Sequence, residues 1–131
     1  MLTGSCLCGA VAYEADASID RIVHCHCQTC RKTHGAAFSS VAAIPRPAFR
    51  WTRGEEHVGA IESSSGKFRR FCTRCGSHVV ADRTAASVVL LRLGCLDTPL
   101  GDLPQVHIWR SDAATWYDPS QRLPEMQEGL T

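Results

Sequence analysis

The stretch His24-Cys25-His26-Cys27-Gln28-Thr29-Cys30 holds the densest group of metal-binding side chains in the sequence. It joins a C-x-C motif directly to a C-x-x-C motif, and Cys27 belongs to both. Thiolates at such short spacing can reach one tetrahedral zinc ion, because a tight turn brings their sulfurs together. Alternation along the strand would place His24 and His26 opposite Cys25 and Cys27, so the histidines are less expected as ligands. The stretch therefore offers three thiolates to one metal ion.

Two further cysteine pairs lie on either side of this stretch. The first is the C-x-C pair Cys6 and Cys8, which we expect in an extended strand whose alternate residues face the same side. The second is the C-x-x-C pair Cys72 and Cys75, followed by Gly76, which permits the positive φ that closes a tight turn. Together the two pairs supply four thiolates, and this predicts a closed structural zinc site.

The division leaves Cys25, Cys27 and Cys30 with an open fourth position on their metal ion. An open position is typical of a zinc ion that binds water or substrate, so these three are candidate catalytic residues. Cys95 stands alone in an apolar run and is predicted to be a buried, inert thiol.

Two other uses of the eight cysteines stay open. They could form disulfides, although the sequence starts without a signal-peptide pattern and clustered cysteines in the reducing cytosol more often hold metal. Alternatively, both zinc sites could be structural, with His24, His26, His34 or a more distant residue completing the second. We expect a cytoplasmic protein with metal-bound thiols.

Composition narrows the class of protein. The chain has 131 residues, 44% hydrophobic and 21% charged, which predicts a single domain over 1–131. A net charge of +1 gives no general attraction to nucleic acid. The longest apolar run, 87–96, is interrupted by Arg92 and is far too short to span a membrane. We therefore expect neither nucleic acid nor membrane as a partner.

Short segments rich in β-branched and aromatic residues follow one another, separated by proline and glycine. This pattern predicts an all-β domain of mainly antiparallel strands. One short helix is expected over 28–33, and a second turn near 111–115. The expected strands cover 10–14, 21–25, 38–44, 49–52, 57–62, 67–71, 78–82, 88–93 and 106–109.

Basic residues cluster near the second and third cysteine groups. The run Lys67-Phe68-Arg69-Arg70 precedes the Cys72 pair, and Arg74 lies inside that pair. Such charges could bind an anion or offset the negative charge of zinc-bound thiolates. The candidate substrate-binding residues are Arg31, Lys32, Arg69, Arg70 and Arg74.

The motifs resemble the glutathione-dependent formaldehyde-activating family, which also includes the centromere protein V type of domain. The resemblance is carried by Gly4-x-Cys6-x-Cys8-Gly9-x-Val11-x-Tyr13, by His24-Cys25-His26-Cys27-x-x-Cys30-Arg31-Lys32 and by Phe71-Cys72-x-x-Cys75-Gly76-Ser77. It covers about 3–110. It implies a β-tent fold of two small zinc-stabilised sheets. It also implies two zinc ions per chain, with Cys6, Cys8, Cys72 and Cys75 as structural ligands and Cys25, Cys27 and Cys30 as catalytic ligands.

The family's namesake activity is the condensation of formaldehyde with glutathione to S-(hydroxymethyl)glutathione, a carbon–sulfur lyase reaction in reverse. The resemblance thus implies a zinc-dependent carbon–sulfur lyase whose partners are a small thiol such as glutathione and an aldehyde. The second zinc is expected to exchange more readily than the first. The alternative, suggested by the centromere-protein relatives, is a non-enzymatic zinc-binding module for partner interaction.

Overall fold

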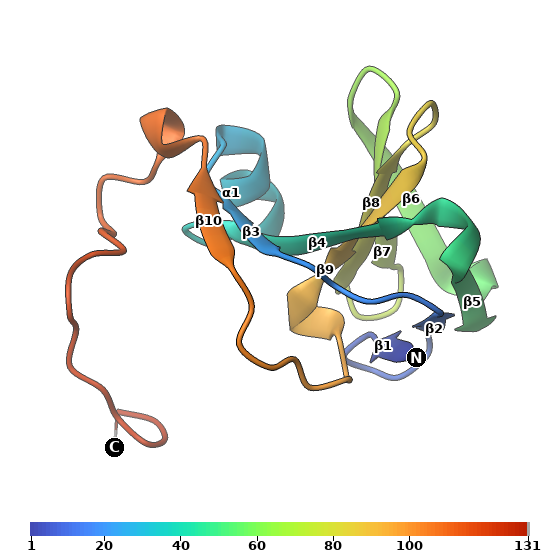
Figure 1. Cartoon of the computed structure of the whole chain (residues 1–131), viewed down its shortest axis with the longest axis horizontal. Helices are drawn as coiled ribbons and strands as arrows, with labels where there is room; N and C mark the ends of the chain where they lie inside the picture. The colour runs from blue at the N-terminus through green and yellow to red at the C-terminus, as the bar shows by residue number, and fades with distance from the viewer. Residues whose placement is uncertain (131) are drawn as a thin grey trace.

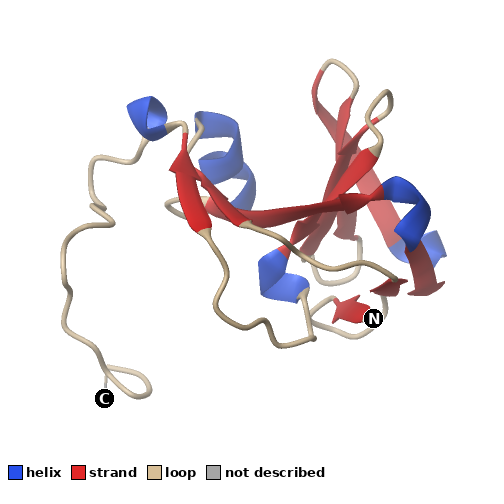
Figure 2. Cartoon of the chain, viewed as in Figure 1, coloured by secondary structure: helices blue, strands red, loops and turns tan. Residues whose placement is uncertain are grey.

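A computed structural model describes residues 1–130 and contains short strands with one α-helix, α1 (Gln28–His34). Three short 3-10 helices, η1 (Arg46–Ala48), η2 (Glu55–His57) and η3 (Leu93–Cys95), lie between strands, and a fourth, η4 (Arg110–Asp112), follows the last strand (Figure 2). The strands are β1 (Leu2–Ser5), β2 (Ala12–Ala15), β3 (Ile22–Cys25), β4 (Ser39–Pro45), β5 (Phe49–Arg53), β6 (Val58–Ser64), β7 (Lys67–Cys72), β8 (His78–Arg83), β9 (Val88–Arg92) and β10 (Gln105–Ile108). The prediction of an all-β fold with little helix is confirmed.

The strands form two sheets (Figure 1). One has three strands in the order β1-β2-β5, and the other has seven in the order β10-β3-β4-β9-β8-β7-β6. Neighbouring strands are antiparallel except β10 and β3, which run parallel. The expectation of mainly antiparallel sheets is therefore met. The larger sheet is bigger than the two small sheets that the family resemblance implied.

The sequence pattern missed β1, because Leu2-Thr3-Gly4-Ser5 has little β-branched or aromatic content. This strand pairs with β2, and Gly4 lies opposite Tyr13. A Cβ on Gly4 would come within 2.3 Å of the Tyr13 ring, so only glycine lets the two strands approach this closely. Tertiary packing, rather than strand propensity, explains why β1 forms.

The hydrophobic core lies between the two sheets. It combines Tyr13 of β2 with Ile44 of β4, Val80 of β8 and Leu91 of β9, all 2% exposed or less. Cys6 and Cys72 also belong to this core. A cysteine cluster is thus built into the packing that joins the sheets.

After η4 the described chain has no further helix or strand. Figure 1 shows this C-terminal segment leaving the body of the molecule as an extended arm. Trp116, Leu123 and Met126 are 70%, 47% and 62% exposed there. Among residues 1–130, no helix combines the length and the apolar character that a membrane crossing requires.

Candidate metal centres and active site

Cys6, Cys8, Cys72 and Cys75 come together between the end of β1 and the turn that follows β7. Their four sulfurs lie within 4.8 Å of one another. The Sγ atoms of Cys6 and Cys8 are 3.7 Å apart, and those of Cys8 and Cys72 are 3.8 Å apart. A tetrahedral zinc ion with bonds of about 2.3 Å places its sulfurs about 3.8 Å apart. The donor set and its spacing therefore fit zinc.

The Cys6 and Cys8 pair reaches this position through a turn. The prediction that the pair lies in an extended strand is wrong, because β1 ends at Ser5 and a turn begins at Leu7. Gly9 has a φ of 79°, which closes the turn. The backbone N–H of Val11 donates a hydrogen bond to Cys6 Sγ at 3.3 Å. The turn thus both converges the two sulfurs and supplies a donor to one of them.

The Cys72 and Cys75 pair also lies on a tight turn. Gly76 has a φ of 80°, as its place after the second cysteine predicted. The backbone N–H of Arg74 donates to Cys72 Sγ at 3.4 Å, and the Ser77 hydroxyl lies 3.2 Å from Cys75 Sγ. Hydrogen bonds from Ser77 lower the pKa of the Cys75 thiol to about 5. Hydrogen bonds within the protein therefore favour the thiolate form of Cys75.

Cys25, Cys27 and Cys30 form the second cluster, at the junction of β3 and α1. Cys25 is the last residue of β3, Cys27 is the N-cap of α1, and Cys30 lies in the first turn of that helix. The three sulfurs lie within 4.8 Å of one another, and the Cys30 N–H donates to Cys27 Sγ at 3.4 Å. The helix expected over 28–33 is confirmed and runs one residue further. β3 ends at Cys25, so strand alternation does not explain the position of Cys27. The turn that leads into α1 places its sulfur near those of Cys25 and Cys30.

The three histidines considered as further ligands have other partners. His24 lies 2.8 Å from the Ser40 hydroxyl and 2.7 Å from the Gln105 side chain. His26 Nε2 lies 2.8 Å from Nδ1 of His107. The His34 ring packs against His78 with 5.2 Å between centroids. Within residues 1–130, the second cluster therefore contains three donors.

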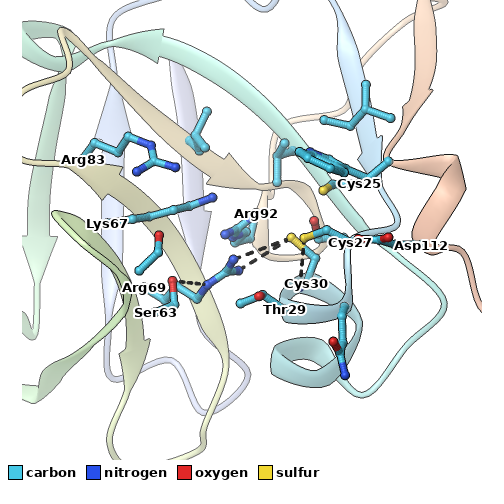
Figure 3. Close-up of a pocket in the computed structure, with 17 residues that line it drawn as sticks. Cys25, Cys27, Thr29, Cys30, Ser63, Lys67, Arg69, Arg83, Arg92 and Asp112 are labelled. Atoms are coloured by element: carbon cyan, nitrogen blue, oxygen red, sulfur yellow. Dashed lines mark hydrogen bonds between the residues drawn. The ribbon is translucent and has the colours of Figure 1, made fainter.

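A cavity of about 440 Å³ opens onto these three cysteines (Figure 3). Its walls come from α1 and from strands β3, β4, β6, β7, β8, β9 and β10, with Trp109 and Asp112 following β10. Trp109 has a φ of 58°, in the left-handed region that a bulky residue rarely adopts. Four of the lining residues are cationic: Lys67, Arg69, Arg83 and Arg92.

Arg69 contacts the second cysteine cluster directly. It is 1% exposed, and its two terminal nitrogens lie 3.8 and 3.7 Å from Cys30 Sγ. Its Nε donates to the Ser63 hydroxyl at 2.9 Å, which fixes the guanidinium (Figure 3). Burial opposes ionisation of Cys30, but the Ser39 hydroxyl and the Arg69 guanidinium lower its pKa to about 7. A cation thus stabilises one thiolate of the cluster.

Among the predicted substrate-binding residues, the structure brings only Arg69 into the cavity lining. Arg31 and Lys32 lie on α1. Arg70 points to Asp82, with Nε 2.8 Å from the carboxylate. Arg74 is exposed beside the four-cysteine cluster.

Arg83 and Arg92 also line the cavity, and neither was among the predicted site residues. Arg92 ends β9 and is 4% exposed. Burial, with the nearby charge of Arg69, lowers the pKa of its guanidinium to about 10. Arg92 could have been recognised from the sequence, because it interrupts an apolar run. A charged side chain in such a run is rarely fully buried unless it is paired.

Cys95 lies outside both clusters. Its thiol donates to the backbone carbonyl of His78 at 3.3 Å. It is half-buried, so the prediction of a buried thiol is only partly met.

The family model described as "Glutathione-dependent formaldehyde-activating enzyme" matches residues 1–112. A crystal structure of a Rhodobacter sphaeroides protein has a similar fold, with a TM-score of 0.65 and 21% sequence identity. The match covers 79% of this chain and 99% of that one.

Fungal relatives are similar over part of their length. An "Uncharacterized lyase" of Schizosaccharomyces pombe is 34% identical over 74 residues, covering 56% of this chain and 52% of the relative. A Phaeosphaeria nodorum protein with the name "Putative glutathione-dependent formaldehyde-activating enzyme" is 30% identical over 95 residues, 72% of this chain and 44% of the relative. The chain spans about half the length of these curated relatives.

Proposed function

The chain belongs to the glutathione-dependent formaldehyde-activating enzyme family, and from this premise we propose that it is a zinc-dependent enzyme. Its reaction would form or break a carbon–sulfur bond between a small thiol and an aldehyde, as in S-(hydroxymethyl)glutathione synthase. Residues 1–131 would act as one zinc-binding domain. The eight free cysteines suit a reducing compartment, and we propose a cytoplasmic location.

One observation carries the proposal: a cluster of three thiols opens into a cavity, whereas the other cluster has four. Three protein ligands are typical of catalytic zinc, and four are typical of structural zinc. We therefore assign Cys25, Cys27 and Cys30 to a catalytic zinc ion. Cys6, Cys8, Cys72 and Cys75 are assigned to a structural one. When bound at an open site, zinc supplies Lewis acidity that polarises a carbonyl and favours the thiolate of a substrate.

The chain's own residues prepare the site for a negatively charged thiol. Arg69 holds a positive charge against Cys30, and Lys67 and Arg83 add charge along the cavity wall. Glutathione is anionic, so this field favours its entry. In the forward reaction the thiol sulfur bonds to the aldehyde carbon, and the thiol proton ends on the carbonyl oxygen.

Exchange NMR of formaldehyde and glutathione with the zinc-loaded chain tests the proposal. We expect faster hemithioacetal formation than in buffer, and zinc analysis should give two ions per chain, one of which exchanges more readily. Background rates across several thiols and aldehydes would contradict the proposal.

A second candidate, a zinc module that binds a partner protein, is favoured by the exposed Trp116, Leu123 and Met126 of the C-terminal arm. It predicts two zinc ions that resist chelators equally and no acceleration of the thiol reaction. Zinc release during chelator titration separates the two candidates.

A further inference from the structure

Arg92 is a buried cation of the cavity without an internal partner. It is 4% exposed and lines the cavity, yet its Nε and Nη2 are buried with no hydrogen-bond partner. The ion pairs within residues 1–130 do not include it. A buried charge without a partner is costly, so a group from outside the described chain is expected to meet it.

The neighbouring cations do not change this conclusion, because they add positive charge. Lys67, Arg69 and Arg83 line the same cavity, and within residues 1–130 none of them is in an ion pair. Asp112 supplies the one carboxylate among the lining residues. The cavity therefore has an excess of positive charge next to the three thiols (Figure 3).

The positive charge of Arg69 is explained by the metal ligands. Three thiolates around a divalent zinc ion leave a net charge of about −1, and Arg69 lies against Cys30 to offset it. Arg92 lines the same cavity as Arg69 and the three cysteines (Figure 3). Formaldehyde and a neutral thiol bring no negative charge to it. A carboxylate does, and its planar shape matches the two-pronged donor geometry of a guanidinium.

We propose that Arg92 binds a carboxylate of the substrate adduct, so that the enzyme selects a thiol or an aldehyde that carries this group near the carbon–sulfur bond. This substrate selectivity rests on the proposed carbon–sulfur bond-forming function. Arg92 and the three thiols line one cavity, so the carboxylate is expected in the same cavity as the reacting carbon–sulfur bond. The carboxylate remains unchanged while the sulfur bonds to the carbonyl carbon. Arg92 is then a specificity-determining residue.

Binding of an unreactive ligand pair tests this without catalysis. The probes are 3-(methylthio)propionate and 3-(methylthio)propionamide, which differ in the carboxylate and have no thiol to bind the metal. By calorimetry with the zinc-loaded chain, we expect the acid to bind about tenfold more tightly or better. Arg92→Gln should remove the preference, whereas Arg122→Gln, at an exposed position of the arm, should retain it. Equal affinity of acid and amide for the unmodified chain would overturn the proposal and leave Arg92 as a counter-charge for the thiolates.

Kinetics then identify which substrate carries the carboxylate. One arm compares 3-mercaptopropionate with its amide, using formaldehyde, and the other compares glyoxylate with glycolaldehyde, using 2-mercaptoethanol. We expect a KM preference for the acid in one arm that Arg92→Gln removes, with zinc content unchanged. Acceleration without acid preference in either arm would overturn the inference. No acceleration of any pair would instead contradict the proposed function, and the binding experiment would still decide the role of Arg92.

Arg92→Gln could unfold the chain, so Arg92→Lys is included and the thermal midpoint of each variant is measured. Lysine keeps the charge and loses the planar fork, so we expect partial acid preference. Should both variants unfold, the acid and amide comparison on the unmodified chain decides alone.

Discussion

The two cysteine clusters differ in what surrounds them more than in their sulfurs. The four-cysteine cluster joins segments far apart in the sequence. Its sulfurs are hydrogen-bonded by backbone N–H groups and by the Ser77 hydroxyl. The three-cysteine cluster comes from one short stretch and faces a cavity with buried arginines. Metal at the first cluster would therefore stabilise the fold, whereas metal at the second would be free to act on a ligand.

Loss of the first cluster should have the largest effect. Cys72 is 0% exposed in the core, so Cys72→Ser removes a ligand and also places a polar group there. Structural zinc contributes on the order of 10 kcal/mol in small domains, comparable with the whole stability of a domain. We expect Cys72→Ser to be unfolded by circular dichroism and to bind little zinc. A variant that melts like the unmodified chain would remove the distinction between the clusters.

Loss of the second cluster should abolish activity and spare the fold. Cys27 is the N-cap of α1, outside the hydrophobic core. We expect Cys27→Ser to lose one zinc ion and all acceleration of the thiol reaction, with only a small change in the thermal midpoint. Cys95→Ser is the matched control, since Cys95 is in neither cluster, and it should keep both ions and full activity.

Arg69 should set the pH at which the second cluster loses its metal. Despite burial, Ser39 and Arg69 lower the pKa of Cys30, so its thiolate persists to lower pH than an ordinary thiol. Zinc should therefore be lost as the pH falls. Removing a nearby opposite charge raises a pKa by roughly 1 unit or more. In Arg69→Gln, zinc release measured with a chromogenic chelator should begin at higher pH.

Arg70→Gln is the control for this shift, because Arg70 pairs with Asp82 away from the cluster. An equal shift in both variants would show that the net charge of the chain, and not the contact with Cys30, controls the metal.

The smallest effect is expected at the hydroxyl beside the first cluster. Ser77 accepts a hydrogen bond from the Leu7 N–H at 3.0 Å and lies 3.2 Å from Cys75 Sγ. Ser77→Ala should lower the free energy of unfolding by about 1 kcal/mol, measured by urea denaturation. It should leave the rate of the thiol reaction unchanged, and a loss of activity would indicate that the two clusters are coupled.

Local features were predictable from the sequence because they depend on neighbours in the chain. The helix after Cys27 and the turn at Gly76 follow from short-range geometry. The strand placement of Cys6 and Cys8 was wrong, since a C-x-C pair converges equally well on a turn. The β1 strand was missed because its formation depends on contact with Tyr13 in β2.

The amino-acid sequence was enough to predict the all-β class and the cysteines within each motif, since a spacing of a few residues limits which neighbouring sulfurs can meet. The charged residues that line the cavity of the three-cysteine cluster became visible only in the folded chain. Sheet register pairs Lys67 with Arg83 and Arg92 with Val41, and so brings charges from three strands to one cavity. The physical reason is that strand pairing is a long-range choice made by the packing of the whole core, which no local motif encodes.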